Sequence, residues 1–226
     1  MNAVLYFTCS GQSKAVAQNL AEKIDFCVYD ILTCEQRNFE SAVIVFPVHC
    51  QTYPPVLKSF FKELNAKYIT LIATYGKASA GNAIYEAAKF FKNKIVAAAY
   101  IPAKHTYDLD GCDGTPTVPD ELIQKIKAPS YIEIPRRVKN IFAGFFPAAR
   151  SRAAIKINKT ENCENCNVCG SSCPVGAMQY GKPTRKCVRC LKCVQLCPHG
   201  ALQVKKSRVL KTYLKRARFE RVIIYV

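Results

Sequence analysis

Three things that the sequence lacks exclude whole classes of protein. No apolar stretch approaches the roughly 20 residues of a membrane-spanning helix, so we expect no membrane span. The first residues, MNAVLYFTCSG, have no basic start and only a short apolar run, so we expect a cytoplasmic protein without a signal peptide. Acidic residues are few, 16 against 33 lysines and arginines. The net charge of +17 suggests acidic partners, nucleic acid or an anionic membrane surface.

Residues 1–128 alternate between strand-like and helix-like segments. The strand-like segments are continuous apolar runs, which are typical of a parallel sheet buried on both faces. The expected strands are 3–8, 26–31, 41–48, 68–76 and 94–103, and the expected helices are 13–24, 54–64, 81–93 and 119–127. The pattern predicts an α/β domain whose ligand binds at the carboxyl ends of the strands.

This alternation stops at Pro129. We expect a connecting segment over 129–158 with a short helix near 136–142. We expect its bulky apolar residues to pack against one or both domains; the alternative is a membrane-surface or partner-binding patch. The bulky apolar residues are Ile132, Phe142, Phe145 and Phe146.

The cysteines divide into a patterned group and a scattered group. Residues 163–178, CENCNVCGSSCPVGAM, align with residues 187–202, CVRCLKCVQLCPHGAL, and both contain C-x2-C-x2-C-x3-C-P. Five more cysteines show no spacing pattern: Cys9, Cys27, Cys34, Cys50 and Cys112. A secreted disulfide scaffold is usually shorter and rich in cysteine throughout, so we expect free thiolates that bind metal. Structural zinc is the alternative, but it usually uses two separated C-x2-C pairs.

The duplicated motif resembles bacterial-type two-cluster ferredoxins, over residues 160–205. In that family the fourth cysteine of each run ligates the other cluster. The resemblance implies one [4Fe–4S] cluster on Cys163, Cys166, Cys169 and Cys197. It implies a second on Cys187, Cys190, Cys193 and Cys173.

The loop FTCSGQS, residues 7–13, joins the first strand to the first helix. A helix N-terminus there provides free N–H groups and the positive end of a dipole, which suits a phosphate. The chain has neither G-x-G-x-x-G nor G-x4-G-K-[ST], so we expect neither a dinucleotide nor a nucleoside triphosphate. Thr-x-Ser-Gly-x-Ser instead resembles the T-x-T-G-x-T phosphate loop of flavodoxins, which bind FMN. The implied residues are Thr8, Cys9, Ser10, Gly11, Gln12 and Ser13.

Three later loops also follow expected strands and complete the candidate FMN site. Tyr53, Tyr75, His49, His105 and Tyr107 are expected to stack on or cover the flavin ring. The candidates are Pro47, Val48, His49, Gln51 and Tyr53 in the first loop, Thr74, Tyr75, Gly76, Lys77 and Gly81 in the second, and His105 and Tyr107 in the third. Two features depart from flavodoxins: PVHCQTYPP (47–55) has no glycine, and the chain has no tryptophan.

As a whole, the chain resembles the flavodoxin–ferredoxin fusion family of anaerobic microbes. The resemblance implies a five-stranded parallel sheet in the order 2-1-3-4-5, followed by a small α+β ferredoxin domain. The expected domains are 1–128 (FMN), 129–158 (connection), 159–205 (two clusters) and 206–226 (basic extension). The implied function is electron transfer between FMN and two [4Fe–4S] clusters, with acidic redox proteins as partners. Two alternatives are an FMN-dependent reductase with its own substrate and a ferredoxin with a flavin-free docking domain.

The last segment, KKSRVLKTYLKRARFERVIIYV (205–226), has eight lysines and arginines and one glutamate. Basic residues interleaved with tyrosine and phenylalanine are compatible with nucleic-acid binding, but no recognition fold accompanies them. We therefore expect no nucleic-acid partner. The preferred interpretations are a docking surface for an acidic redox partner or a strand, RVIIYV, that caps a domain.

Overall fold

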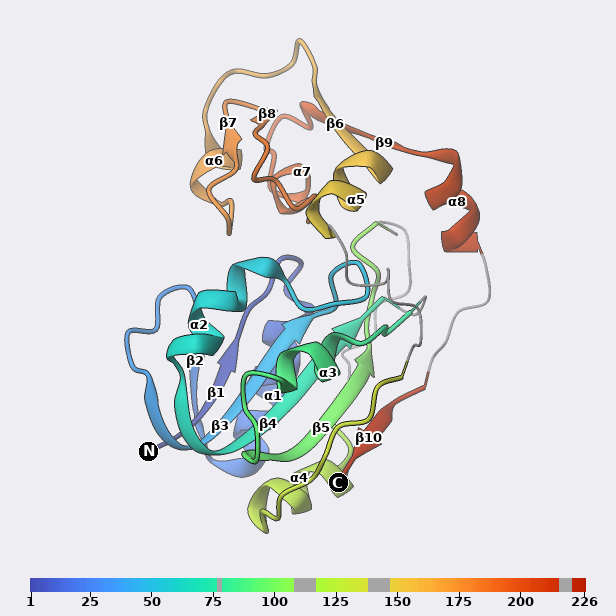
Figure 1. Cartoon of the computed structure of the whole chain (residues 1–226). Helices are drawn as coiled ribbons and strands as arrows, with labels where there is room; N and C mark the ends of the chain where they lie inside the picture. Colours follow the sequence, from blue (N-terminus) through green and yellow to red (C-terminus); the bar gives the residue numbers. More distant parts are fainter. Residues whose placement is uncertain (77–78, 108–116, 138–146, 216–220) are drawn as a thin grey trace. The chain divides into compact units, whose positions relative to one another are not determined.

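The computed structural model describes residues 1–76, 79–107, 117–137, 147–215 and 221–226 (Figure 1). The chain divides into two compact units. The first contains Met1–Phe145 and Arg218–Val226, and the second contains Phe146–Ala217. No helix among these described residues is long and apolar enough to cross a membrane.

The first unit is built on a six-stranded sheet in the order β10-β5-β4-β3-β1-β2. The five strands predicted from the sequence are all present and parallel, in the predicted order 2-1-3-4-5. They are β1 (Asn2–Tyr6), β2 (Cys27–Asp30), β3 (Asn38–Pro47), β4 (Asn65–Tyr75) and β5 (Ile95–Pro102). This order is that of flavodoxin-like sheets, so the predicted fold class is confirmed.

The sixth strand was not part of the predicted sheet. β10 (Ile223–Tyr225) pairs antiparallel with β5, so the last residues of the chain return to the first unit. The predicted five-stranded sheet is therefore extended by one strand. The suggestion that RVIIYV forms a domain-capping strand is confirmed.

Helices cover both faces of this sheet, which explains the continuous apolar strands. Alternate residues of β3 point to opposite sides: Val43 and Val45 pack with α1 (Gln12–Ile24) and α4 (Asp120–Lys127), whereas Ala42, Ile44 and Phe46 face the other side. That other side is covered by the 3-10 helix η1 (Pro55–Leu57), α2 (Lys58–Glu63) and α3 (Ala83–Ala88). A strand buried on both faces needs an apolar residue at every position.

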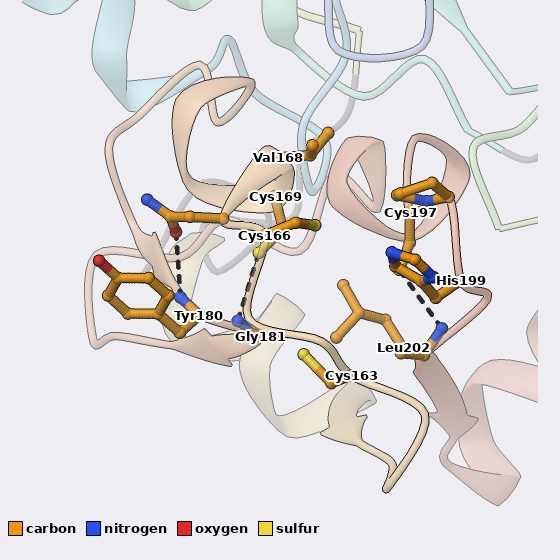
Figure 2. Close-up of a pocket in the computed structure, with 12 residues that line it drawn as sticks. Cys163, Cys166, Val168, Cys169, Tyr180, Gly181, Cys197, His199 and Leu202 are labelled. Carbon is orange, nitrogen blue, oxygen red and sulfur yellow. Dashed lines mark hydrogen bonds between the residues drawn. The ribbon is translucent and has the colours of Figure 1, made fainter.

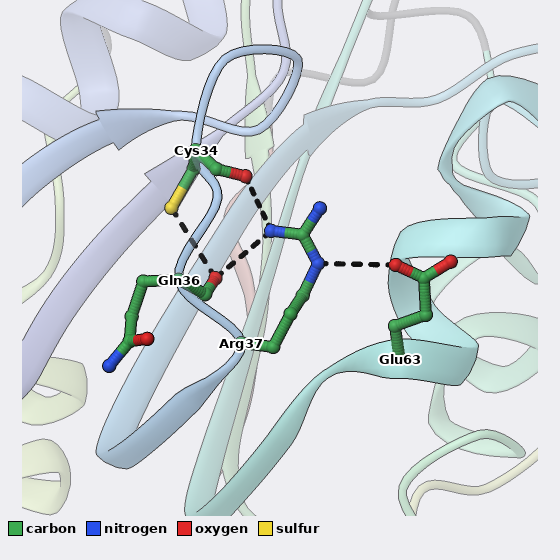
Figure 3. Close-up of polar contacts among 4 residues, drawn as sticks. All are labelled: Cys34, Gln36, Arg37 and Glu63. Carbon is green, nitrogen blue, oxygen red and sulfur yellow. Dashed lines mark hydrogen bonds and ion pairs between the residues drawn. The ribbon is translucent and has the colours of Figure 1, made fainter.

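Arg37 ties the loop after β2 to helix α2 (Figure 3). Its Nη1 donates to the backbone oxygen atoms of Cys34 and Gln36, and its Nε lies 3.3 Å from a Glu63 carboxylate oxygen. Its guanidinium also lies 4.9 Å from the centre of the Phe60 ring. Arg37 O also accepts from Asn65 N at 2.8 Å, so these contacts lie at the amino ends of β3 and β4, away from the carboxyl ends of the strands.

The second unit is a small α+β structure. β6 (Ile155–Lys159) pairs antiparallel with β9 (Leu202–Lys206), and β7 (Met178–Gln179) pairs with β8 (Lys182–Pro183). Helical turns α6 (Val168–Ser171) and α7 (Lys192–Gln195) lie in the two cysteine motifs. α5 (Pro147–Ala154) precedes β6, and α8 (Arg208–Lys215) follows β9.

The segment expected to connect the domains contributes to both units. Ile132 packs on the core of the first unit, as predicted, and its N–H donates to Ile95 O at 2.8 Å. Residues 147–158, in contrast, lie in α5 and β6, so the second unit begins before the expected boundary at residue 159. Most of the helix expected near 136–142, together with Phe142, Phe145 and Phe146, lies outside the described residues.

Candidate functional site

The two cysteine motifs fold into the same backbone conformation. Residues 24 positions apart share left-handed φ angles: 58° and 59° at Asn165 and Arg189, and 57° and 62° at Asn167 and Leu191. Gly176 and Gly200 both have a φ of 57°. The helical turns α6 and α7 start directly after Asn167 and Leu191. The two motifs therefore present their cysteines in equivalent ways.

Four cysteines from both motifs line one pocket (Figure 2). Cys163, Cys166 and Cys169 come from the first motif, and Cys197 comes from the end of the second. This is the set that the ferredoxin resemblance assigns to one cluster. Among the residues that the structure describes, no group of three or more histidine, cysteine or acidic side chains is placed to hold a single metal ion.

Backbone N–H groups point at three of the cysteine sulfurs. Ala177 N donates to Cys173 Sγ at 3.2 Å, and Ala201 N makes the equivalent bond to Cys197 Sγ at 3.3 Å. Gly181 N donates to Cys169 Sγ at 3.2 Å. Each donor follows a glycine or is itself a glycine, which allows the backbone to approach the sulfur closely. Such bonds stabilise negative charge on a thiolate and tune a bound cluster.

The remaining cysteines gather around Cys193. Burial, together with the charges of Cys190, Cys187, Cys173 and Cys169, raises the pKa of the Cys193 thiol to about 12. Three of these neighbours are the other members of the second predicted ligand set. Because metal ligands must be deprotonated, a buried thiol of this kind requires the positive charge of a metal to become a thiolate.

The candidate phosphate loop folds tightly at the start of α1. Gly11 has a left-handed φ of 87°, and its N–H donates to Thr8 Oγ1 at 2.9 Å. Ser13 is buried, and its hydroxyl lies 2.8 Å from the Thr74 hydroxyl at the end of β4. The first turn has no acidic residue, and Gln12 Oε1 is buried without a hydrogen-bond partner among the described residues. The N–H groups of this first turn, which contains no acidic residue, fit a phosphate.

The loops after β3 and β4 are joined to each other. His49 and Thr52 exchange two backbone hydrogen bonds of 2.8 and 3.0 Å, across a turn in which Cys50 and Gln51 have φ angles of 48° and 72°. Two positive φ angles define a type I′ turn, which usually contains glycine. Gln51 O accepts from Asn82 N at 2.9 Å, and Val48 N donates to Thr74 O at 2.7 Å. The strained turn is thus held in place by the neighbouring loop.

The third loop lies at the same end of the sheet. The His105 ring packs against Gly76, where a Cβ atom would lie only 2.4 Å from the ring. His105 and Tyr107 have ring centroids 5.1 Å apart, and His105 Nδ1 accepts from Tyr107 N at 3.1 Å. Both side chains are half-buried. This pair suits the predicted role of covering a flat ligand.

Two other predicted tyrosines are used in packing. Tyr75 is 2% exposed, and its hydroxyl donates to Arg221 O at 2.6 Å. Tyr53 is half-buried and packs on Phe61 and Phe90, with ring centroids 5.3 and 5.8 Å away. Burial and the charge of Glu86 raise the pKa of Tyr53, so its hydroxyl stays protonated at neutral pH. Lys77 lies outside the described residues.

The family comparison identifies iron–sulfur binding in the second unit. Residues 183–203 match the 4Fe-4S binding domain family, and this range includes Cys187, Cys190, Cys193 and Cys197. The strand order of the first unit and this match in the second unit together give the organisation of the chain. The chain joins a flavodoxin-like fold to a 4Fe–4S binding domain. The first motif, 163–173, lies outside the matched range but has the same cysteine spacing.

The search of curated proteins found no match, and three of the solved structures that resemble the chain share 12–18% of its sequence. A putative flavoprotein from Bacteroides uniformis ATCC 8492 is 15% identical over 46% of this chain and 92% of its own, with a TM-score of 0.39. A flavodoxin from the domain Archaea is 18% identical over 57% of this chain and 92% of its own, with a TM-score of 0.35. Rubredoxin oxygen:oxidoreductase from the anaerobe Desulfovibrio gigas is 12% identical over 55% of this chain and 34% of its own, with a TM-score of 0.38. The flavodoxin-like assignment is based on the strand order.

One pairing between site residues, and two residues that contribute to the sites, were not foreseen from the sequence. Thr74 was a candidate, but its pairing with Ser13 across 61 residues was not foreseen. Asn82 connects the β3 and β4 loops and also accepts from Arg137 N at 3.0 Å. Arg152 Nη1 donates to Arg185 O at 2.7 Å, so α5 helps to hold the second cysteine motif. Single polar residues give no periodic signal that would reveal these contacts.

Replacing Gly81 with alanine should disturb the candidate flavin site. Gly81 has a φ of 58°, and an added Cβ would lie 2.4 Å from both Cβ and O of Gln51. Strain and overlap together should cost about 2–4 kcal/mol of unfolding free energy. FMN affinity should fall by at least about tenfold, because the two loops would separate. Urea denaturation and flavin fluorescence titration would measure both effects.

Gly176→Ala provides the matched control. Gly176 has nearly the same φ, 57°, but a Cβ there would meet no atom within 4 Å. It should cost the left-handed strain alone, about 1 kcal/mol, and leave FMN binding unchanged. Equal flavin affinities for the two variants would show that the contact between Gly81 and Gln51 does not shape a flavin site.

Proposed function

We propose that this protein is an electron carrier with one FMN and two [4Fe–4S] clusters, acting in a reducing cytoplasm. The observation that supports it most directly is the pocket lined by Cys163, Cys166, Cys169 and Cys197. Cysteines 28 residues apart, Cys169 and Cys197, share this pocket although they belong to different motifs. A two-cluster ferredoxin requires this exchange of the fourth ligand.

The first cluster would be held by these four cysteines and the second by Cys187, Cys190, Cys193 and Cys173. The N–H groups of Ala177, Gly181 and Ala201 would stabilise the thiolates from outside. FMN would place its phosphate on residues 8–13 and its ring near His49, Gly76 and His105. When bound, the flavin supplies exchange of one or two electrons, and each cluster supplies exchange of one electron at low potential.

The test is anaerobic purification followed by iron, acid-labile sulfide and flavin assays. We expect about eight irons, about eight sulfides and about one FMN per chain, and an electron paramagnetic resonance signal of two reduced clusters after dithionite treatment. Zinc in place of iron, or a colourless protein, would contradict the proposal. Clusters without flavin would favour the alternative of a ferredoxin with a docking domain.

The reductase alternative predicts a different mutational result. In that case His49 would supply a proton to a substrate at the flavin, so His49→Ala would abolish substrate reduction while the cofactors remain bound. Under the electron-carrier proposal, His49→Ala should transfer electrons to an artificial acceptor at nearly the wild-type rate. The comparison requires flavin and iron contents equal to those of the wild type.

A further inference from the structure

The charges of the second unit are distributed unequally between its two motifs. Residues 147–215 contain fourteen lysines and arginines but only two acidic residues, Glu161 and Glu164, both in or beside the first motif. Because the backbone repeats every 24 residues, equivalent positions can be compared directly. At four positions in or beside the first motif, the equivalent residue of the second motif is a cation. The pairs are Glu161 and Arg185, Asn162 and Lys186, Asn165 and Arg189, and Val168 and Lys192.

The cations of the second motif are partly on the surface and partly structural. Arg189 Nε donates to Ile155 O at 3.0 Å, and its Nη1 is buried, so this side chain holds β6 in place. Arg185 and Lys186 instead occupy the centre of a turn closed by a 3.2 Å hydrogen bond from Cys187 N to Thr184 O. Both are exposed, as is Lys182 on the preceding strand β8. They therefore project into solvent directly before Cys187.

Helix α5 adds a fourth cation to this turn. Arg152 Nη1 lies 2.7 Å from Arg185 O, which places its guanidinium against the backbone of the turn. We define the cationic face as Arg152, Lys182, Arg185 and Lys186. No acidic residue occurs between Glu164 and residue 215, so the turn has no acidic neighbour in its own segment of the chain.

We propose that the cationic face is the docking surface for an acidic electron-transfer protein. This inference rests on the proposed function, because it places the partner next to the predicted ligand Cys187. Complementary charge accelerates encounter and orients the two proteins, which shortens the distance for electron transfer. Each encounter passes one electron: one protein is oxidised by one electron, the other is reduced by one, and no bond forms or breaks.

Nucleic acid is the other anionic class that a basic surface attracts. Proteins that bind single strands combine cations with aromatic side chains that stack on bases. Residues 181–212 contain no phenylalanine, tyrosine or tryptophan, and Tyr180, two residues before Lys182, is a single exposed aromatic side chain. The position of the cations beside a predicted redox centre, with one aromatic side chain and not a series of them, favours a protein partner.

The experiment compares two triple charge reversals in the full-length holoprotein. K182E/R185E/K186E removes the cationic face except for Arg152. K205E/K211E/K215E changes the net charge by the same amount, at exposed positions in β9 and α8 of the same unit. An acidic free-standing flavodoxin is the probe. Its dissociation constant is measured by calorimetry, and its second-order electron-transfer rate by stopped flow, between about 20 and 300 mM salt.

The face variant should lower the low-salt electron-transfer rate about 10- to 100-fold and lose most of its salt dependence. The control variant should stay within about threefold of the wild type, because its cationic face is intact. Its net charge equals that of the face variant, so a difference between the two variants reports on the position of the charges. Equal losses in the two variants would overturn the proposal, as would an unchanged rate in the face variant. Loss of oligonucleotide binding in the face variant, with flavodoxin binding intact, would assign the face to nucleic acid and also overturn it.

Cluster content separates this inference from the proposed function. Iron, sulfide and electron paramagnetic resonance are measured for each protein before the probe is added. If the wild type contains no [4Fe–4S] cluster, the proposed function fails. If clusters are present in all three proteins and the salt dependence is unaffected by the face variant, only the docking surface fails.

Discussion

Replacing Cys197, in the second cysteine motif, with alanine should halve the iron content. The cluster that is lost should be the one whose other three ligands come from the first motif. Cys197 lines the same pocket as Cys163, Cys166 and Cys169. A cluster that lacks one of its four thiolates is exposed to solvent and lost, so iron should fall from about eight to about four atoms per chain. The second cluster should remain, because its predicted ligands are intact. Iron and sulfide assays, with spin quantification after reduction, would measure the loss.

Double substitutions determine which cysteines act together. Cys197→Ala with Cys163→Ala should lose no more iron than Cys197→Ala alone, because both remove the same cluster. Cys197→Ala with Cys187→Ala should lose nearly all iron, since it removes one ligand from each cluster. The reverse pattern would mean that each motif holds its own cluster. Cys27→Ala is the control: Cys27 is exposed in the first unit, and its loss should leave the iron content unchanged.

The repeat and the sheet were predictable because both leave strong local patterns. The eight cysteines recur at fixed spacing, and their surrounding backbone repeats with the same φ angles. Strands such as β3 are buried on both faces and therefore appear as unbroken apolar runs. The loop before α1 lies between a strand and a helix, as expected, and its role as a phosphate loop stays a prediction from its hydroxyl and glycine residues. These signals depend only on neighbouring residues.

The features that were missed depend on contacts between distant parts of the chain. Tyr75 lies at the end of a predicted strand and was expected to cover a flavin, but it is 2% exposed and its hydroxyl donates to Arg221 O, 146 positions away in the chain. α5 and β6 were expected to be a connection, because α5 has no apolar periodicity and β6 is only five residues long. β10 has three residues, too few to identify its partner from the sequence.

Removing residues 221–226 should destabilise the flavodoxin-like unit and expose a strand edge. β10 pairs with β5 through Ile223, Ile224 and Tyr225. The Tyr225 ring packs on the buried Tyr100 with centroids 6.5 Å apart, and Tyr75 loses its acceptor at Arg221 O. A buried hydroxyl without its acceptor costs about 1–3 kcal/mol, and lost side-chain burial adds to it. We expect a total loss of about 3–5 kcal/mol of unfolding free energy.

Two probes would show that the loss is confined to the first unit. Flavin fluorescence reports on the first unit and cluster absorbance on the second. The truncated protein should release flavin at lower urea, while cluster bleaching should keep its midpoint. Sedimentation should show self-association, because the unpaired edge of β5 can pair with another chain. Val226→Ala, at a residue 43% exposed beyond the strand, should change stability by less than about 0.5 kcal/mol.

The same truncation tests whether β10 has a role in electron transfer. The chain leaves the first unit before residue 147 and returns to it at β10, so the second unit is attached to the first at both of its ends. Without β10, a single connection remains, and the effective concentration of one unit at the other falls. Electron transfer between flavin and clusters within one chain should then slow by about tenfold or more, although both cofactors remain bound. An unchanged rate in flash reduction of the truncated protein would show that β10 stabilises the sheet without restraining the second unit.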